Sequence, residues 1–250
     1  MKKLYILLAV LLVAAMILPA CAPAAPDCKD EKTFCVGLVT DVGKINDKSF
    51  NQSAWEGVQR AEKELGATVQ YIETADAKDY AKNMATFADA GYDVIVTVGF
   101  NLGEATVAAA GTYPNVKFIG VDQFQSADTP GVAGLSFPED NAGFLVGALA
   151  SMMSKTNKIG AVCGTDAVPP VWRFGEGYKA GAAYADGMKG TTTEVFVVYH
   201  SDVGFDKTFT DPEWGASTAQ SMMDQGADAI FGCGGITGNG AITKAAQSGA

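Results

Sequence analysis

The chain has a single histidine, His200, and lacks the residue clusters that common catalytic and metal sites need. No CxxC pair and no Cys/His group occurs, which argues against a zinc site. No GxSxG or Cys/His pattern supplies an activated nucleophile. The GxxxxGK[ST] phosphate loop and the GxGxxG dinucleotide fingerprint are also missing from their expected contexts. The sequence therefore predicts a protein that is not an enzyme and uses no metal or cofactor, and we interpret His200 as structural.

Positive charge is scarce as well. There are 18 Lys and Arg residues against 28 Asp and Glu residues, and the net charge is −10. Because contacts to a phosphate backbone require a basic surface, this balance argues against a nucleic-acid partner. An apolar content of 48% and a charged content of 18% are typical of a globular chain with a proper core.

A long apolar run is present only at the N-terminus. The basic start at 1–3 is followed by a nearly unbroken apolar stretch at 4–18. This pattern predicts a secretory signal over residues 1–20, because the apolar run is short of the about 20 residues that span a bilayer. The end of the signal resembles a lipobox, which predicts that Cys21 is lipidated; the alternative is an ordinary cleaved signal. We expect residues 21–33 to form a tether that anchors the protein at the extracytoplasmic face of the cell membrane.

The other four cysteines fall into two pairs. Cys28 and Cys35 lie seven residues apart, and outside the cytoplasm they could close a small disulfide loop. Two unpaired thiols are the alternative. Cys163 and Cys233 each lie in an apolar, strand-like run, so we interpret them as buried, unreactive thiols.

Strand-like apolar runs alternate with amphipathic helical stretches along the mature chain. Strands that are apolar on both faces and alternate with helices predict parallel sheets covered by helices on both sides. The expected strands are 34–40, 68–72, 93–99, 117–122, 131–137, 158–164, 193–199 and 228–233. The expected helices are 50–65, 79–90, 103–110, 139–154, 172–187, 214–225 and 240–248.

The second half of this pattern repeats the first in outline. Tyr92–Gly99 and Ala227–Gly234 are counterparts, each a strand that ends in glycine. We therefore predict an α/β fold of two similar lobes with a cleft between them. The N-terminal lobe is expected over 34–130, and the crossover and second lobe over 131–250. The chain stops where the first lobe supplies its fourth strand, so we expect the second lobe to be truncated; a naturally short variant is the alternative.

In open α/β sheets, ligands bind outside the carboxyl ends of the strands. The segments expected there are 41–52, 99–101, 122–124, 164–174 and 234–238. They supply carboxylates, carboxamides and aromatic rings, which suit a neutral, polar, flat ligand.

Individual residues of these segments have alternative roles. Phe50 has helical spacing to Ala54 and Val58 and could belong to the core. Asp41 and Asp47 could be turn or capping residues. Trp172 could be a surface or hinge aromatic.

The stretch LVTDVGKINDKSFNQ at 38–52 resembles the opening motif of the basic membrane protein (BMP) family, the PnrA-like binding lipoproteins of ABC transporters. The resemblance continues through GYD at 91–93, FIGVD at 118–122, VWRFGEGYKAG at 171–181 and GGITG at 234–238.

The resemblance implies a two-lobed, periplasmic-binding-protein-like (type I) fold that closes on a purine nucleoside. It also implies that Asp41, Phe50, Asn51 and Asp122 of the first lobe line the ligand site. The second lobe would add Phe174 or Trp172 as the opposing aromatic and the backbone of Gly235. Asn46 and Gln52, in the loop that carries the opening motif, are further candidate ligand residues. The family pattern continues to a second GVD aspartate and a later lysine, and neither occurs in these 250 residues.

The leading hypothesis is thus a nucleoside-binding lipoprotein, monomeric, that delivers its ligand to an ABC permease in the membrane. One alternative is a sensor of the same fold that reports to a partner protein, and another is a receptor for a different small polar solute, such as a sugar or a vitamin. A secreted nucleoside hydrolase is a further alternative, but the acidic residues are scattered among the loops and do not form the metal-binding cluster expected of such an enzyme.

Overall fold

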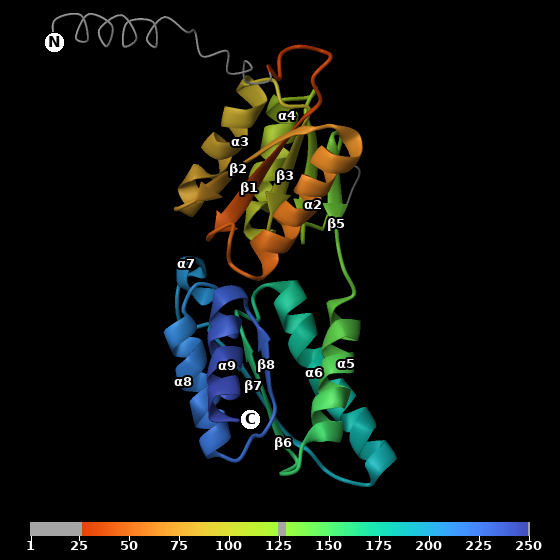
Figure 1. Ribbon diagram of the computed structural model, residues 1–250, viewed down its shortest axis with the longest axis vertical. Coiled ribbons are helices and arrows are strands. Elements are labelled where there is room, and N and C mark those ends of the chain that lie inside the picture. Colours follow the sequence, from red (N-terminus) through yellow and green to blue (C-terminus); the bar gives the residue numbers. More distant parts are fainter. Residues whose placement is uncertain (1–26, 125–128, 250) are drawn as a thin grey trace, which may run out of the picture.

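A computed structural model describes residues 27–124 and 129–249 of the protein (Figure 1). The predicted signal at 1–20, the lipidation of Cys21 and the first part of the tether lie outside the described residues. The described chain forms two α/β lobes, one above the other in Figure 1, and each is built on a parallel sheet. The predicted fold class is confirmed.

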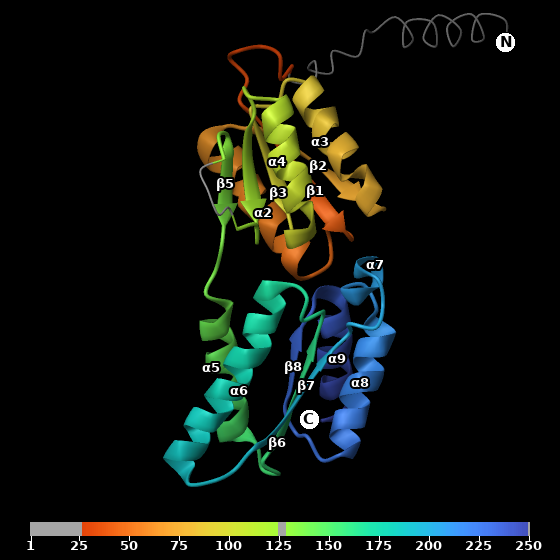
Figure 2. The ribbon, with the colours of Figure 1, turned by 180° about the vertical axis from the view of Figure 1, so that it is seen from behind.

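The first lobe contains a five-stranded sheet in the order β2-β1-β3-β4-β5, in which every neighbouring pair is parallel. Helices α3 and α4 cover one face of this sheet and α2 covers the other (Figures 1 and 2). The strands are β1 (Cys35–Val42), β2 (Thr68–Thr74), β3 (Val94–Val98), β4 (Lys117–Val121) and β5 (Val132–Leu135). The helices are α2 (Phe50–Leu65), α3 (Tyr80–Asp89) and α4 (Gly103–Thr112), with short 3-10 turns at Ala77–Asp79 and Phe100–Leu102.

Strand β1 shows why the strands are apolar throughout. Cys35 and Val39 point into the core shared with α3 and α4. Val36 and Leu38, the alternate residues, point into the core shared with α2. Both faces of the strand are therefore buried, and burial of both faces removes the polar alternation of a half-exposed strand.

Helix α2 ends at Gly66, as the sequence predicts. Gly66 has a left-handed backbone (φ 69°), and its N–H donates to the carbonyls of Ala61 and Glu62. Glycine adopts this conformation without a Cβ penalty and closes the helix.

The second lobe has a sheet with the order β7-β6-β8, three parallel strands within the described residues. Helices α8 and α9 cover one face; α6 covers the other and packs along α5 (Figures 1 and 2). The strands are β6 (Lys158–Cys163), β7 (Glu194–Tyr199) and β8 (Ile230–Cys233). The helices are α5 (Glu139–Met153), α6 (Pro169–Lys189), α7 (Phe205–Thr208), α8 (Pro212–Asp224) and α9 (Gly235–Ser248).

Glycines allow α5 and α6 to touch at the backbone. Gly143 and Gly147 of α5 lie against the carbonyl groups of Phe174 and Tyr178. A Cβ at either glycine has no room, so the close approach of the two helices depends on these residues.

The chain passes from the first lobe to the second after β5. Strand β5 pairs with β4 from Phe118↔Val132 to Val121↔Leu135. It lies in the segment 131–250, which was predicted to hold the crossover and the second lobe. It is the fifth strand of the first sheet, and α5 then begins the second lobe at Glu139.

Both cysteine pairs are joined. Cys28 and Cys35 form a disulfide with an S–S distance of 2.02 Å, which ties the segment before β1 to the start of that strand. Cys163 and Cys233 also form a disulfide. The interpretation of these two as unpaired thiols is wrong, because β6 and β8 are neighbours and their register places the two residues opposite each other.

Candidate functional site

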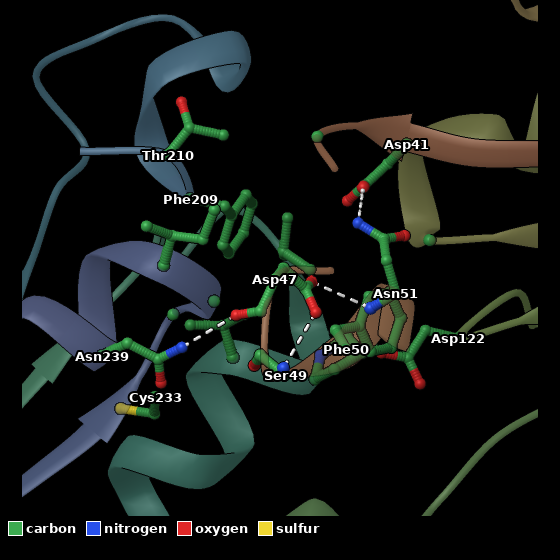
Figure 3. Close-up of a pocket in the computed structure, with 18 of the residues that line it drawn as sticks. Asp41, Asp47, Ser49, Phe50, Asn51, Asp122, Phe209, Thr210, Cys233 and Asn239 are labelled. Carbon is green, nitrogen blue, oxygen red and sulfur yellow. Dashed lines mark hydrogen bonds between the residues drawn. The ribbon is translucent and has the colours of Figure 1, made fainter. Parts of the chain in front are cut away.

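The two sheets direct the carboxyl ends of their strands toward each other (Figure 1). A cavity of about 430 Å³ lies between the lobes there, and Figure 3 shows residues that line it. The first lobe lines it with the end of β1, the following loop, and the residues after β3 and β4. The second lobe contributes the start of α6, the segment before α8, and the end of β8 with the start of α9. The volume falls within the range of sites for small molecules.

Asp47 orders the loop between β1 and α2. Its buried carboxylate accepts hydrogen bonds from the backbone N–H groups of Ser49 and Gln52 at 2.8 and 3.1 Å. It accepts a further bond from Asn51 N at 2.9 Å. Asp47 therefore satisfies backbone donors at the beginning of α2 and fixes the helix that carries Phe50 and Asn51.

Asp41 and Asn51 form a polar pair at the cavity wall. Asn51 Nδ2 donates to Asp41 Oδ1 at 2.8 Å (Figure 3). Burial raises the pKa of Asp41 to about 7, the bond from Asn51 lowers it, and the charge of Asp47 raises it. Near neutral pH, Asp41 can therefore accept a hydrogen bond as the anion or donate one as the acid.

The second amide atom of Asn51, its oxygen, has no such partner within the described part of the chain. Asn51 Oδ1 is buried and accepts no hydrogen bond from the residues that the structure describes. A buried acceptor without a donor is costly, and a donor on a bound ligand would remove that cost.

Asp122 follows β4 with a left-handed backbone (φ 58°) and lines the same cavity. Burial raises its pKa to about 6; the charge of Glu139 raises it too, and Arg173 lowers it. Arg173 and Glu139 are paired at 3.1 Å. The next residue, Gln123, is buried and donates to the carbonyls of Thr97 and Gly99, which anchors the turn that presents Asp122.

Aromatic side chains reach the cavity from both lobes. Phe50 comes from the first turn of α2, and Phe174 from α6. Phe209 lies between α7 and α8, and Phe231 lies in β8. Rings on both sides of a cleft can enclose a flat heterocycle between their faces.

The structure brings six of the nine predicted ligand residues into the cavity wall, namely Asp41, Phe50, Asn51, Asp122, Phe174 and Gly235. The other three do not line it. Asn46 is exposed, and Trp172 is 49% exposed on α6. Gln52 accepts from Lys48 N and donates to Glu56, both in its own lobe.

Phe209 and Asn239 also line the cavity, although both lie outside the segments that the sequence predicts for the site. Phe209 lies in the connection after β7, at the carboxyl edge where ligands bind, so the rule that selected the other loops could have selected this one. Asn239 lies one turn inside α9, beyond the glycine-rich segment that was considered.

His200 lies outside this wall. It is buried, its ring is stacked on Trp214 at 3.9 Å, and its two ring nitrogens approach Asp202 and Asp211.

Within 27–124 and 129–249, no group of three or more His, Cys, Asp or Glu residues could hold a metal ion. No helix in those ranges has both the length and the apolar character needed to cross a membrane.

Residues 34–250 match a family described as ABC transporter substrate-binding protein PnrA-like. Among curated proteins, the CD4+ T-cell-stimulating antigen of Listeria monocytogenes is 34% identical over 95% of this chain and 66% of its own length. The ABC transporter nucleoside-binding protein BmpA of Lactococcus lactis is 34% identical over 83% of this chain and 57% of its own length.

Among solved structures, an ABC transporter solute-binding protein from Aeropyrum pernix has a TM-score of 0.77 and 32% identity. The match covers 86% of this chain and 59% of that one. The chain thus spans between 57% and 66% of the lengths of these three proteins.

Proposed function

Because this chain belongs to the PnrA-like family of ABC transporter substrate-binding proteins, we propose that it captures a purine nucleoside in the cleft between its lobes. The observation that carries the proposal is the composition of the cavity wall. It combines phenylalanine rings from both lobes with a carboxyl–carboxamide pair, Asp41 and Asn51.

Each component suits one part of a nucleoside. The faces of Phe50 and Phe209 can hold the flat base between the lobes. Asp41 and the free Asn51 Oδ1 can accept hydrogen bonds from N–H groups at the edge of a purine. Asp122, farther along the same edge of the sheet, is a candidate acceptor for ribose hydroxyls. The name of the Lactococcus relative, a nucleoside-binding protein, supports the same assignment.

We further propose that the protein works at the extracytoplasmic face of the cell membrane, held there by lipid on Cys21, and delivers its ligand to an ABC permease. The N-terminal sequence and the family support this placement.

Titration calorimetry with guanosine, adenosine and inosine tests the ligand assignment. Phe50→Ala should weaken binding at least tenfold, because it removes a ring that contacts the base; a buried aromatic contributes several times the free energy of one tenfold step. Trp172→Ala is the matched control, since Trp172 lies outside the cavity wall and its removal should change affinity less than twofold. Equal affinities for wild type and Phe50→Ala would refute the assignment of the cavity.

A further inference from the structure

We propose that Asn239 holds the two lobes together in the closed state and thereby sets how long the cleft retains its ligand. The effect on ligand retention rests on the proposed function, whereas the effect on lobe closure does not. Two-lobed proteins exchange between open and closed states by a hinge movement, so a contact made only in the closed state favours closure.

The contact itself joins residues that lie 192 positions apart. Asn239, on α9 of the second lobe, donates from Nδ2 to the backbone carbonyl of Asp47 in the first lobe at 3.0 Å. Figure 3 shows this bond crossing the cavity region between the two lobes. Both residues also line the cavity, so the bond lies beside the space that a ligand would occupy.

The acceptor is held in a rigid turn. The carboxylate of Asp47 accepts bonds from three backbone N–H groups at the beginning of α2, and the residue is 8% exposed. Because the side chain fixes the turn, the carbonyl of Asp47 points toward the second lobe in a defined direction. Movement of the carbonyl away from Asn239 therefore requires movement of the beginning of α2 with it.

The helix that carries the donor is packed closely against its own lobe. Asn239 lies between Gly238 and Gly240, and a Cβ at either position would meet the backbone of Gly232 or Pro212. Helix α9 is thus seated directly on β8 and on the beginning of α8. A helix packed at this distance does not slide to follow a departing partner, so separation of the lobes breaks the bond from Nδ2 to Asp47 O.

The net contribution of one intramolecular hydrogen bond changes an equilibrium constant by about two- to tenfold. Loss of the Asn239 bond should therefore lower the ratio of closed to open protein by this factor. If ligand is retained by the closed state, the dissociation constant rises by up to the same factor. The change should be in the dissociation rate, because the open state that admits the ligand is unaltered.

Small-angle X-ray scattering of the ligand-free protein tests closure directly. Asn239→Ala should increase the radius of gyration, and Asn239→Asp should do so at least as much, because a carboxylate cannot donate to a carbonyl. Thr243→Ala, an exposed position one turn along the same helix, is the matched control and should leave the scattering unchanged. The melting temperature of all three variants should stay close to that of wild type, which separates a change in closure from damage to the second lobe.

Stopped-flow measurement with guanosine supplies the second readout, with about a two- to tenfold faster dissociation expected for Asn239→Ala. Unchanged scattering together with unchanged dissociation would overturn the role of Asn239 while leaving the nucleoside assignment intact. If none of guanosine, adenosine and inosine binds to wild type, the proposed function fails, and the scattering alone still decides between a closing contact and none.

Discussion

Replacing Asp41 by asparagine should remove a pH dependence that this carboxyl group imposes on stability. Its pKa is 3.8 in the reference state and about 7 in the folded protein, because burial disfavours the anion. The folded protein therefore binds more protons than the unfolded chain between these two values. The free energy of unfolding contributed by Asp41 is thus fully present below about pH 4 and is lost as the pH rises through about 7.

The difference between the two pKa values corresponds to a change of at most about 4 kcal/mol in the free energy of unfolding. Water that reaches the cleft screens part of this difference, so we expect about 1–2 kcal/mol between pH 5 and pH 8. Asp122, with a pKa raised to about 6 chiefly by burial, contributes in the same direction. Carboxyls with lowered pKa values, such as those of Asp186 and Asp228, act in the opposite direction, but below about pH 4.

Urea unfolding of the ligand-free protein, followed by circular dichroism at pH 5, 6, 7 and 8, measures the effect. Asp41→Asn keeps an oxygen that can accept from Asn51 Nδ2 and does not titrate, so its free energy of unfolding should fall less between pH 5 and pH 8 than that of wild type. Asp122→Asn is the comparison and should remove a smaller part of the slope. Parallel pH profiles for wild type and Asp41→Asn would refute the claim that burial holds the proton on Asp41.

Two further predictions concern the second lobe. Gly147→Ala should lower the free energy of unfolding, measured in urea, by at least about 2 kcal/mol, because the new Cβ would meet the carbonyl of Tyr178. Gly187→Ala is the control: its Cβ would meet nothing within 4 Å, so the change should be neutral or stabilise by up to about 1 kcal/mol. Equal losses in both variants would contradict the packing of α5 on α6. A non-reducing peptide map of the oxidised protein should contain a linked pair of peptides holding Cys163 and Cys233, and alkylation of both as free thiols would contradict the pairing.

The regular alternation of apolar strand runs with amphipathic helices made most of the fold predictable from the sequence. A short apolar run such as β3, which is buried on both faces, is typical of a parallel sheet that helices cover on both sides. Gly66 marked the end of α2 because a left-handed residue was needed there. Pairing between distant strands left no comparable signal. The neighbouring positions of β6 and β8 decide that Cys163 and Cys233 meet, and strand order is a property of the tertiary fold.

The site was predictable where strand ends located it. Asp41 and Asp122 lie at the carboxyl ends of β1 and β4, and both reach the cavity. Side-chain direction on a helix was harder to predict. Trp172 and Phe174 are two positions apart on α6, so they point to different sides, and only Phe174 lines the cavity. The sequence offers both rings as candidates, and only the packing of α6 on the second sheet distinguishes the two.

Calorimetric titration of the wild-type protein with a panel of small solutes tests the central claim most directly. We predict saturable binding of at least one purine nucleoside, with one site per chain, and no heat with ribose, glucose, free amino acids or thiamine at the same concentrations. Clear binding of a sugar, an amino acid or a vitamin, with no heat from any nucleoside, would contradict the account.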